Sequence, residues 1–187
     1  MRMYLRIAPI LVIWALFLRG VLAQETTWKE LTLEVVKLVQ QGKYPEAAEV
    51  AQRALKVAEE TFGPDHQVVA VSLNNLATVY RMQGKYAEAE ELYQRALAIK
   101  ERKLGPDHPK VATSLNNLAG LYRAQGKYTE AEPLYERALR IREKALRQNH
   151  PDLGESLNNL GLLYKTQGKY AEAESLYKRA LTIWEKA

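Results

Sequence analysis

The stretch SLNNL occurs three times in this chain, beginning at Ser72, Ser114 and Ser156. Each copy places two adjacent asparagines among apolar residues in a sequence that otherwise favours a helix. Asparagine is a poor helix former and costs up to about 0.7 kcal/mol relative to alanine in a helix interior. A pair of asparagines that recurs three times therefore requires a structural or functional reason.

The three copies belong to a repeat of 42 residues. The tripeptide GKY keeps the same step, and residues 66–107 match residues 108–149 at most positions without a gap. Periods of about 20 to 50 residues are typical of solenoids and repeat arrays. The first unit is atypical, because Thr32 and Leu33 stand where the later units have the asparagine pair. We divide the repeat region into units at residues 24–65, 66–107, 108–149 and 150–187.

Each unit contains two helical patterns and no pattern typical of a strand. Leu73, Leu76, Ala77 and Tyr80 form the apolar stripe of the first pattern in the second unit. Gly84, in the GKY that follows, is expected to end this helix in a left-handed conformation. We predict an all-α fold of four stacked helix-turn-helix hairpins.

The hairpins are joined by the sequence GPDH. Gly63 and Gly105 are expected to end the preceding helices. Asp65 and Asp107 are then placed to cap the helices that follow.

The stretch NNLATVYRMQGKYAEAEELYQRAL, residues 74–97, resembles a tetratricopeptide repeat. The 42-residue step and the sequence LGPDHPKVATSLNNLA, residues 104–119, are similar to the repeats of kinesin light chains. The resemblance covers residues 25–187 and implies a right-handed α-solenoid that binds proteins or peptides without catalysis. The positions that carry the family pattern in the second unit are Leu76, Ala77, Tyr80, Gly84, Tyr86, Ala89, Tyr93 and Ala96.

The first 23 residues are typical of a signal peptide. Arg2 and Arg6 precede a mostly apolar run, residues 7–18, and VLA stands before Gln24 at the expected cleavage site. This run is shorter than the roughly 20 residues that a helix needs to cross a bilayer. We expect export to the periplasm or the extracellular space after cleavage. The alternative is an uncleaved segment that anchors the protein to a membrane through residues 7–18.

Charge and composition argue against several other classes of function. The formal net charge of +5 falls to +2 without Arg2, Arg6 and Arg19. A charge this small does not indicate a protein that binds nucleic acid. The basic runs KERK, residues 100–103, and RIREK, residues 140–144, are interpreted as solvated outer faces. The chain has no cysteine, which excludes disulfides, thiolate metal sites and a cysteine nucleophile.

The three histidines are the remaining candidates for a metal site or a general base. His66, His108 and His150 lie one repeat apart, so we expect them about 10 Å or more from one another. Ligands of one zinc ion each lie about 2 Å from it, which requires a much closer approach. We interpret these histidines as helix-entry or loop residues and expect no enzymatic activity, no metal and no cofactor.

The asparagine pair provides the candidate binding site. On a helical wheel Asn74 lies about 100° from the apolar stripe and Arg81 about 80° from it, so both belong to one polar strip. An asparagine amide can bond both the N–H and the C=O of a passing peptide backbone. Kinesin light chain repeats, by the resemblance, hold extended peptides with asparagines at this position. The alternative is that these asparagines bond between helices.

The strip recurs in every later unit and carries a cation each time, which favours an acidic peptide as the ligand. The second asparagines, Asn75, Asn117 and Asn159, fall near 200° and are interpreted as structural. The six residues predicted to bind the peptide are Asn74, Asn116, Asn158, Arg81, Arg123 and Lys165.

The last unit ends at Ala187 without a polar capping helix. We expect an apolar patch there, which seldom stays uncovered on a monomer, and hence a weak homodimer. The alternative function is a self-assembly module that stacks through this C-terminal unit. The residues expected to form the patch are Leu176, Tyr177, Ala180, Leu181, Ile183 and Trp184.

Overall fold

The computed structural model describes the backbone of residues 4–186 and the side chains of residues 22–186. These residues form helices and no strand, which confirms the all-α prediction. The predicted signal peptide, residues 1–23, lies almost entirely outside the side chains that are described. The helices are α1 (Tyr4–Gln40), α2 (Tyr44–Phe62), α3 (Gln67–Met82), α4 (Tyr86–Leu104), α5 (Pro109–Ala124), α6 (Tyr128–Ala145), α7 (Pro151–Thr166) and α8 (Tyr170–Glu185).

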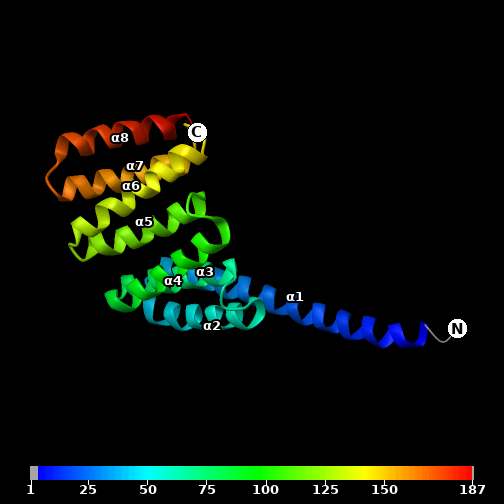
Figure 1. Cartoon of the computed structure of the whole chain (residues 1–187). Coiled ribbons are helices and arrows are strands. Elements are labelled where there is room, and N and C mark those ends of the chain that lie inside the picture. Colours follow the sequence, from blue (N-terminus) through cyan, green and yellow to red (C-terminus); the bar gives the residue numbers. More distant parts are fainter. Residues whose placement is uncertain (1–3, 187) are drawn as a thin grey trace.

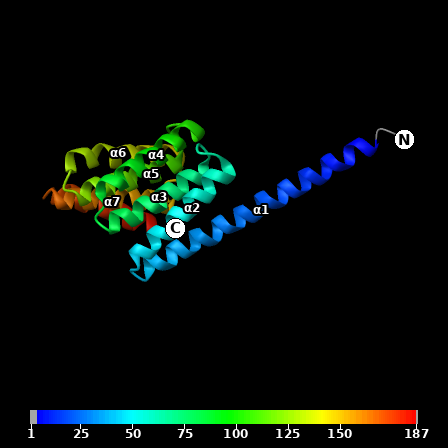
Figure 2. The same cartoon turned by 90° about the horizontal axis from the view of Figure 1, so that it is seen from below.

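Consecutive helices pack as four antiparallel hairpins that stack from α1 and α2 at one end to α8 at the other (Figure 1). The first helices of successive units, α1, α3, α5 and α7, also contact one another in that order. Figure 2 shows α2 lying against the C-terminal part of α1, whose N-terminal part extends beyond the stack. No helix in the described part of the chain has the length and apolar character required to cross a membrane.

The GKY tripeptides form the turns inside the hairpins, as predicted. Gly84 has φ 76°, in the left-handed region that favours glycine, and the other three GKY glycines share this conformation. Gly63 and Gly105 end α2 and α4 with φ 84° and 88°. The helix boundaries therefore follow the glycines that the sequence repeats.

The predicted caps at the joints are wrong in one respect. The histidines, and not Asp65 or Asp107, cap the first helices: Nδ1 of His108, for example, accepts a hydrogen bond from the backbone N–H of Lys110 at 3.1 Å. His66 and His150 cap α3 and α7 in the same way, which confirms that the histidines are helix-entry residues. The two aspartates instead form exposed ion pairs with basic side chains one repeat later, Asp65 with Arg102 and Asp107 with Lys144.

A buried serine at the start of each SLNNL stretch joins two units. Ser114 Oγ accepts from Lys100 Nζ at 2.8 Å and from Asn74 Nδ2 at 3.4 Å, and both donors belong to the preceding unit. Ser156 Oγ accepts in the same way from Arg142 Nη1 at 2.9 Å and from Asn116 Nδ2 at 3.1 Å. The first asparagines of the second and third units, Asn74 and Asn116, thus bond between helices.

The atypical first unit reaches the next serine with a different donor. Trp28 Nε1 on α1 donates to Ser72 Oγ at 2.8 Å. Ala58 stands at the position that Lys100 occupies one repeat later, so no cation is available here. An indole N–H is a donor only, and it therefore suits a buried hydroxyl acceptor.

The interpretation of the two basic runs as solvated faces is wrong for one residue in each. Lys100 is 7% exposed and Arg142 is 1% exposed, because both side chains turn inward to reach the serines. Arg142 also has acidic partners, since its Nη1 lies 3.0 Å from Glu155 Oε2. Lys100 forms no ion pair with any described carboxylate. Burial, and secondly the charge of Lys110, lower the pKa of Lys100 from 10.5 to about 8.

Replacing Lys100 with methionine is predicted to stabilise the protein at pH 7. The lysine remains protonated in the unfolded chain up to pH about 10.5, whereas in the folded protein it loses its proton near pH 8. The burial penalty is therefore fully present below pH 8 and disappears as the pH rises to 10.5. We expect Lys100→Met to raise the free energy of unfolding by roughly 1–3 kcal/mol at pH 7.

Urea denaturation at several pH values measures this difference. The wild-type protein and the variant share their tyrosines and other lysines, so the titration of those groups cancels in the comparison. The stability difference should shrink between pH 8 and 10.5. A difference that is constant over this range would show that Lys100 does not carry the buried charge.

Candidate functional site

A hollow of about 210 Å³ lies where three first helices meet, and we call it the central hollow. It is formed by α3, α5 and α7, with contributions from the second helices α4 and α6. Its lining is mostly polar. The residues that line it are Thr78, Arg81, Tyr93, Asn116, Asn117, Gly120, Arg123, Tyr135 and Asn159.

Two buried tyrosines support the central hollow from the second helices. Tyr93 Oη lies 2.8 Å from Thr78 Oγ1, so the hydroxyl groups of α4 and α3 are hydrogen-bonded to each other. Tyr135, at the corresponding position of the next unit, has Gly120 opposite it in place of a threonine. Burial raises the pKa of Tyr135, although the nearby charges of Arg123 and Arg81 oppose the shift.

The central hollow brings together three of the six residues predicted to bind a peptide, namely Arg81, Asn116 and Arg123. Neither arginine forms an ion pair with a carboxylate in the described part of the chain. Asn74 is buried below this surface, where its Nδ2 also donates to the carbonyl of Ala70 at 2.9 Å.

The other two predicted residues lie outside the central hollow. Asn158 is half-buried on α7. Lys165 lies at the far end of the stack, beside a separate apolar hollow on α8 that includes Tyr170 and Tyr177. The predicted strip recurs regularly in the sequence, but only three of its six residues, Arg81, Asn116 and Arg123, line the central hollow.

Two of the second asparagines, which the sequence analysis interprets as structural, lie at the open face of the first helices. Asn117 and Asn159 both line the central hollow, next to Arg81 and Arg123. The reason is geometric. The apolar stripe of a first helix packs on its own second helix, and neighbouring units cover its two sides, so the open face lies about opposite the stripe, near 200°.

Two polar atoms at the central hollow are buried and have no partner among the described residues: Asn116 Oδ1, an acceptor, and Arg123 Nε, a donor. Asn116 uses its amide nitrogen for Ser156, which leaves its oxygen available. A buried polar atom without a hydrogen bond costs about 1–3 kcal/mol. Asn116 and Arg123 therefore retain an unsatisfied acceptor and an unsatisfied donor in the wall of the central hollow.

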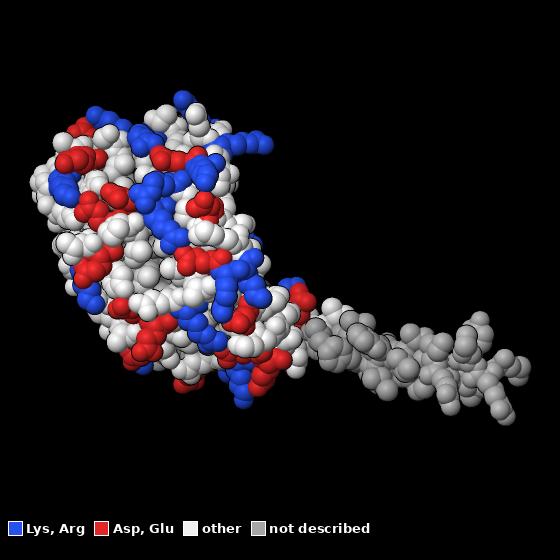
Figure 3. Space-filling model, in the orientation of Figure 1, with Lys and Arg blue, Asp and Glu red and all other residues white. Residues whose placement is uncertain are grey.

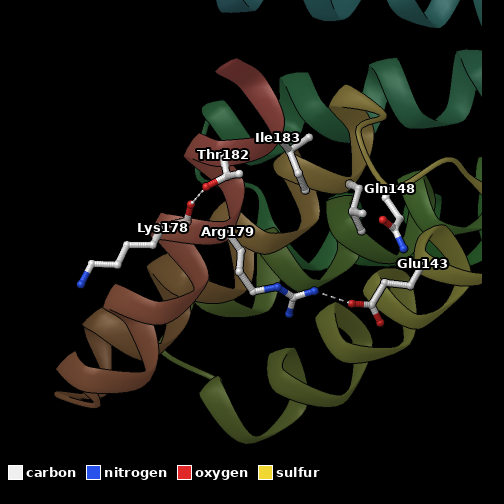
Figure 4. A pocket seen from close by; sticks show the side chains of 7 residues that line it. Glu143, Gln148, Lys178, Arg179, Thr182 and Ile183 are labelled. Carbon is white, nitrogen blue, oxygen red and sulfur yellow. Dashed lines mark hydrogen bonds and ion pairs between the residues drawn. The ribbon is translucent and has the colours of Figure 1, made fainter. Parts of the chain in front are cut away.

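A larger hollow, of about 570 Å³, lies on the outer side between the end of α6 and α8. Figure 4 shows Arg179 pointing from α8 towards Glu143 on α6, and the two side chains pair at 2.9 Å. The same pair occurs one repeat earlier between Arg137 and Glu101 at 2.7 Å. Because these charges neutralise each other between successive second helices, we assign this hollow to the packing of the stack.

The surface charge is mixed. On the face drawn in Figure 3, basic and acidic side chains are interspersed over the stacked hairpins. In the described part of the chain no three histidine or acidic side chains lie close enough to hold a metal ion.

Comparison with known families identifies the repeat. The family model for the tetratricopeptide repeat matches three overlapping stretches, residues 38–102, 69–144 and 110–186. The chain belongs to the tetratricopeptide repeat family. Tetratricopeptide repeats generally mediate protein–protein interactions, and the scaffold that they form is generally non-catalytic. No curated protein matches this tetratricopeptide repeat chain significantly.

Solved structures of kinesin light chain-like repeats are similar to this protein. BtubC (BKLC) from P. vanneervenii is 31% identical with a TM-score of 0.73, over 85% of this chain and 63% of that one. This chain thus spans somewhat less than two thirds of that protein. A putative kinesin light chain of Podosopora anserina, with nearly identical TPR-like repeats, is 29% identical with a TM-score of 0.72, over 85% of this chain and 75% of that one.

Proposed function

We propose that this protein is a non-catalytic scaffold that binds an extended, acidic peptide segment of a partner protein across the first helices of its repeats. The observation that carries the proposal is the pair Arg81 and Arg123, which line one hollow and form no ion pair with a carboxylate among residues 22–186. Charge-assisted hydrogen bonds from arginine to carboxylate are about twice as strong as neutral ones. An acidic side chain is therefore the ligand group that suits these two arginines best.

The asparagines support the extended form of the ligand. Asn117 and Asn159 stand on successive first helices, α5 and α7, and helices in contact lie about 8–10 Å apart. An extended chain advances about 3.3 Å per residue, so these amides meet its backbone about every third residue. Such contacts recognise the backbone whatever the ligand side chains are, while the arginines select for acidic residues. We expect affinity in the micromolar range, or about −8 kcal/mol.

A peptide-binding assay with matched charge reversals tests the proposal. Fluorescence anisotropy with short synthetic peptides of graded charge should show binding that increases with acidity and weakens with added salt. Arg123→Glu should lower the affinity for acidic peptides about tenfold or more, because it places a carboxylate against them. Arg140→Glu is the control, since Arg140 lies exposed on α6 and pairs only with Glu136 of its own helix. Equal loss in both variants, or loss only in Arg140→Glu, would contradict the proposal.

A second variant alters the shape of the central hollow without changing its charge. Gly120 stands where the preceding unit has Thr78, and a Cβ at this position meets Tyr135 Oη at 3.4 Å. Gly120→Thr therefore reduces the space and supplies a hydroxyl like that of Thr78. If the ligand occupies the central hollow, this variant should bind more weakly while its melting temperature stays close to that of the wild type.

Self-assembly through α8 is a second candidate function. Tyr170 is 70% exposed and Leu181 is 54% exposed, and both border an apolar hollow of about 320 Å³. Trp184 is also exposed, although its ring packs over Gly154, whereas Ala180 and Ile183 are buried by their own unit. The exposed patch is thus smaller than the sequence suggests. A second copy of this chain is the occupant that this hypothesis requires.

Sedimentation velocity distinguishes the two candidates. If α8 mediates self-assembly, the mass should rise with protein concentration, and Leu181→Glu should abolish the rise because it places a charge in the apolar contact. Arg140→Glu, on the outer face of α6, serves as the control. If the wild-type protein and Leu181→Glu are both monomers at high concentration, the self-assembly hypothesis is eliminated. The peptide-binding proposal is not affected by that result.

Export is part of the proposal and rests on residues 1–23. N-terminal sequencing of the protein purified from its natural source should find Gln24 as the first residue, in the periplasmic or extracellular fraction. Recovery of a chain that begins at Met1 and remains with the membranes would favour the anchored alternative instead.

A further inference from the structure

Two corresponding joints between units differ in how their buried cation is neutralised. Arg142, between the third and fourth units, faces Glu155 and Asp152 of α7. Lys100 occupies the same position one repeat earlier. The residues that correspond to Glu155 and Asp152 there are Thr113 and Lys110.

Lys100 therefore occupies the position at which the next repeat pairs its buried cation with carboxylates, and no described carboxylate pairs with Lys100. Lys100 is 7% exposed, and its ammonium group donates to Ser114 Oγ at 2.8 Å, which uses one of its three donors. Lys110, also on α5, adds a second positive charge. Asn74 on α3, which shares Ser114 with the lysine, is uncharged.

Thr113 is exposed and occupies the position that Glu155 has in the next repeat. Its Oγ1 accepts from Arg142 Nη2 at 3.2 Å, so a carboxylate at this position would face Arg142 as well as Lys100. Thr113 also precedes Asn117 by four residues on α5 and shares its face of the helix. The two side chains are separated by about 6 Å along the helix axis, so the site adjoins the central hollow.

We propose that a second carboxylate of the acidic ligand binds at this site, over Lys100 and beside Thr113, where Glu155 lies in the next repeat. This inference rests on the proposed function and narrows it: the ligand carries at least two acidic groups, one for Arg81 and Arg123 and one for Lys100. Lys110 and Arg142 attract the same group. The preferred partner segment is therefore one with closely spaced acidic residues, and a single carboxylate fills only one of the two sites.

The proposal predicts a change in the pKa of Lys100 that can be measured separately from the affinity for the peptide. In the free protein burial lowers the pKa of Lys100 to about 8. A carboxylate placed against the ammonium group favours its charged form and raises that pKa. Binding of the ligand and protonation of Lys100 must then strengthen each other, and the affinity must fall as the pH rises above 8.

The experiment follows the pKa of Lys100 by NMR of its Cε signal, assigned with Lys100→Met, in the full protein. The probe is a short synthetic peptide of alternating glutamate and alanine, and the neutral match has glutamine in place of glutamate. The glutamate peptide should raise the pKa of Lys100 and the glutamine peptide should not. Thr113→Glu supplies the carboxylate from the chain itself and should raise this pKa without peptide, while weakening binding of the glutamate peptide about tenfold. Thr113→Gln is the matched control and should do neither.

The outcomes separate this inference from the proposed function. If the glutamate peptide binds and Arg123→Glu prevents binding, but the pKa of Lys100 stays unchanged in the complex, the central hollow remains the site and the second carboxylate site is refuted. Equal affinity of Thr113→Glu and Thr113→Gln for the glutamate peptide would refute it too. If acidic peptides do not bind the wild-type protein at all, both proposals fail.

Discussion

The hydrogen bonds that converge on three buried serines hold successive units of this solenoid together. Ser72, Ser114 and Ser156 each accept from a donor of the preceding unit, and two of them accept from an asparagine as well as from a cation. A buried hydroxyl without a partner would destabilise the stack by about 1–3 kcal/mol, so each serine fixes the position of the unit before it. Asn74 and Asn116 complete this bond, which outweighs the weak helix propensity of asparagine at these two positions.

The remaining properties of the first helices follow from this constraint. Asn74 and Asn116 direct their amide nitrogens towards the next unit, whereas Asn117 and Asn159 face outwards and line the central hollow together with Asn116. In the third unit the dipeptide thus serves two purposes: the amide nitrogen of Asn116 joins two units, and Asn117 lies at the open face. The cations divide in the same way, because Lys100 and Arg142 are buried at the serines whereas Arg81 and Arg123 line the hollow.

The sequence predicts the architecture well because the same helix and turn signals recur in successive repeats. The GKY glycines, the helical stripes and the histidines at helix entry all lie where the 42-residue step places them. The position of the open face is harder to predict from the sequence, for a physical reason. A helical wheel identifies the apolar stripe, but it does not reveal that neighbouring units cover the two sides of a first helix. Basic runs are also ordinarily solvated, so the inward turn of Lys100 and Arg142 required knowledge of their partners across the joint.

The central claim is that Asn116 stabilises the stack whereas Asn117 lies at the open face. The stability of the variants Asn116→Ala and Asn117→Ala tests this claim most directly. Urea denaturation should show that Asn116→Ala lowers the free energy of unfolding by about 1–2 kcal/mol, because the bond to Ser156 is lost. Asn117→Ala should leave that free energy unchanged or raise it by up to about 0.7 kcal/mol, since alanine is the better helix former. Equal losses in the two variants, or a larger loss for Asn117→Ala, would contradict this account.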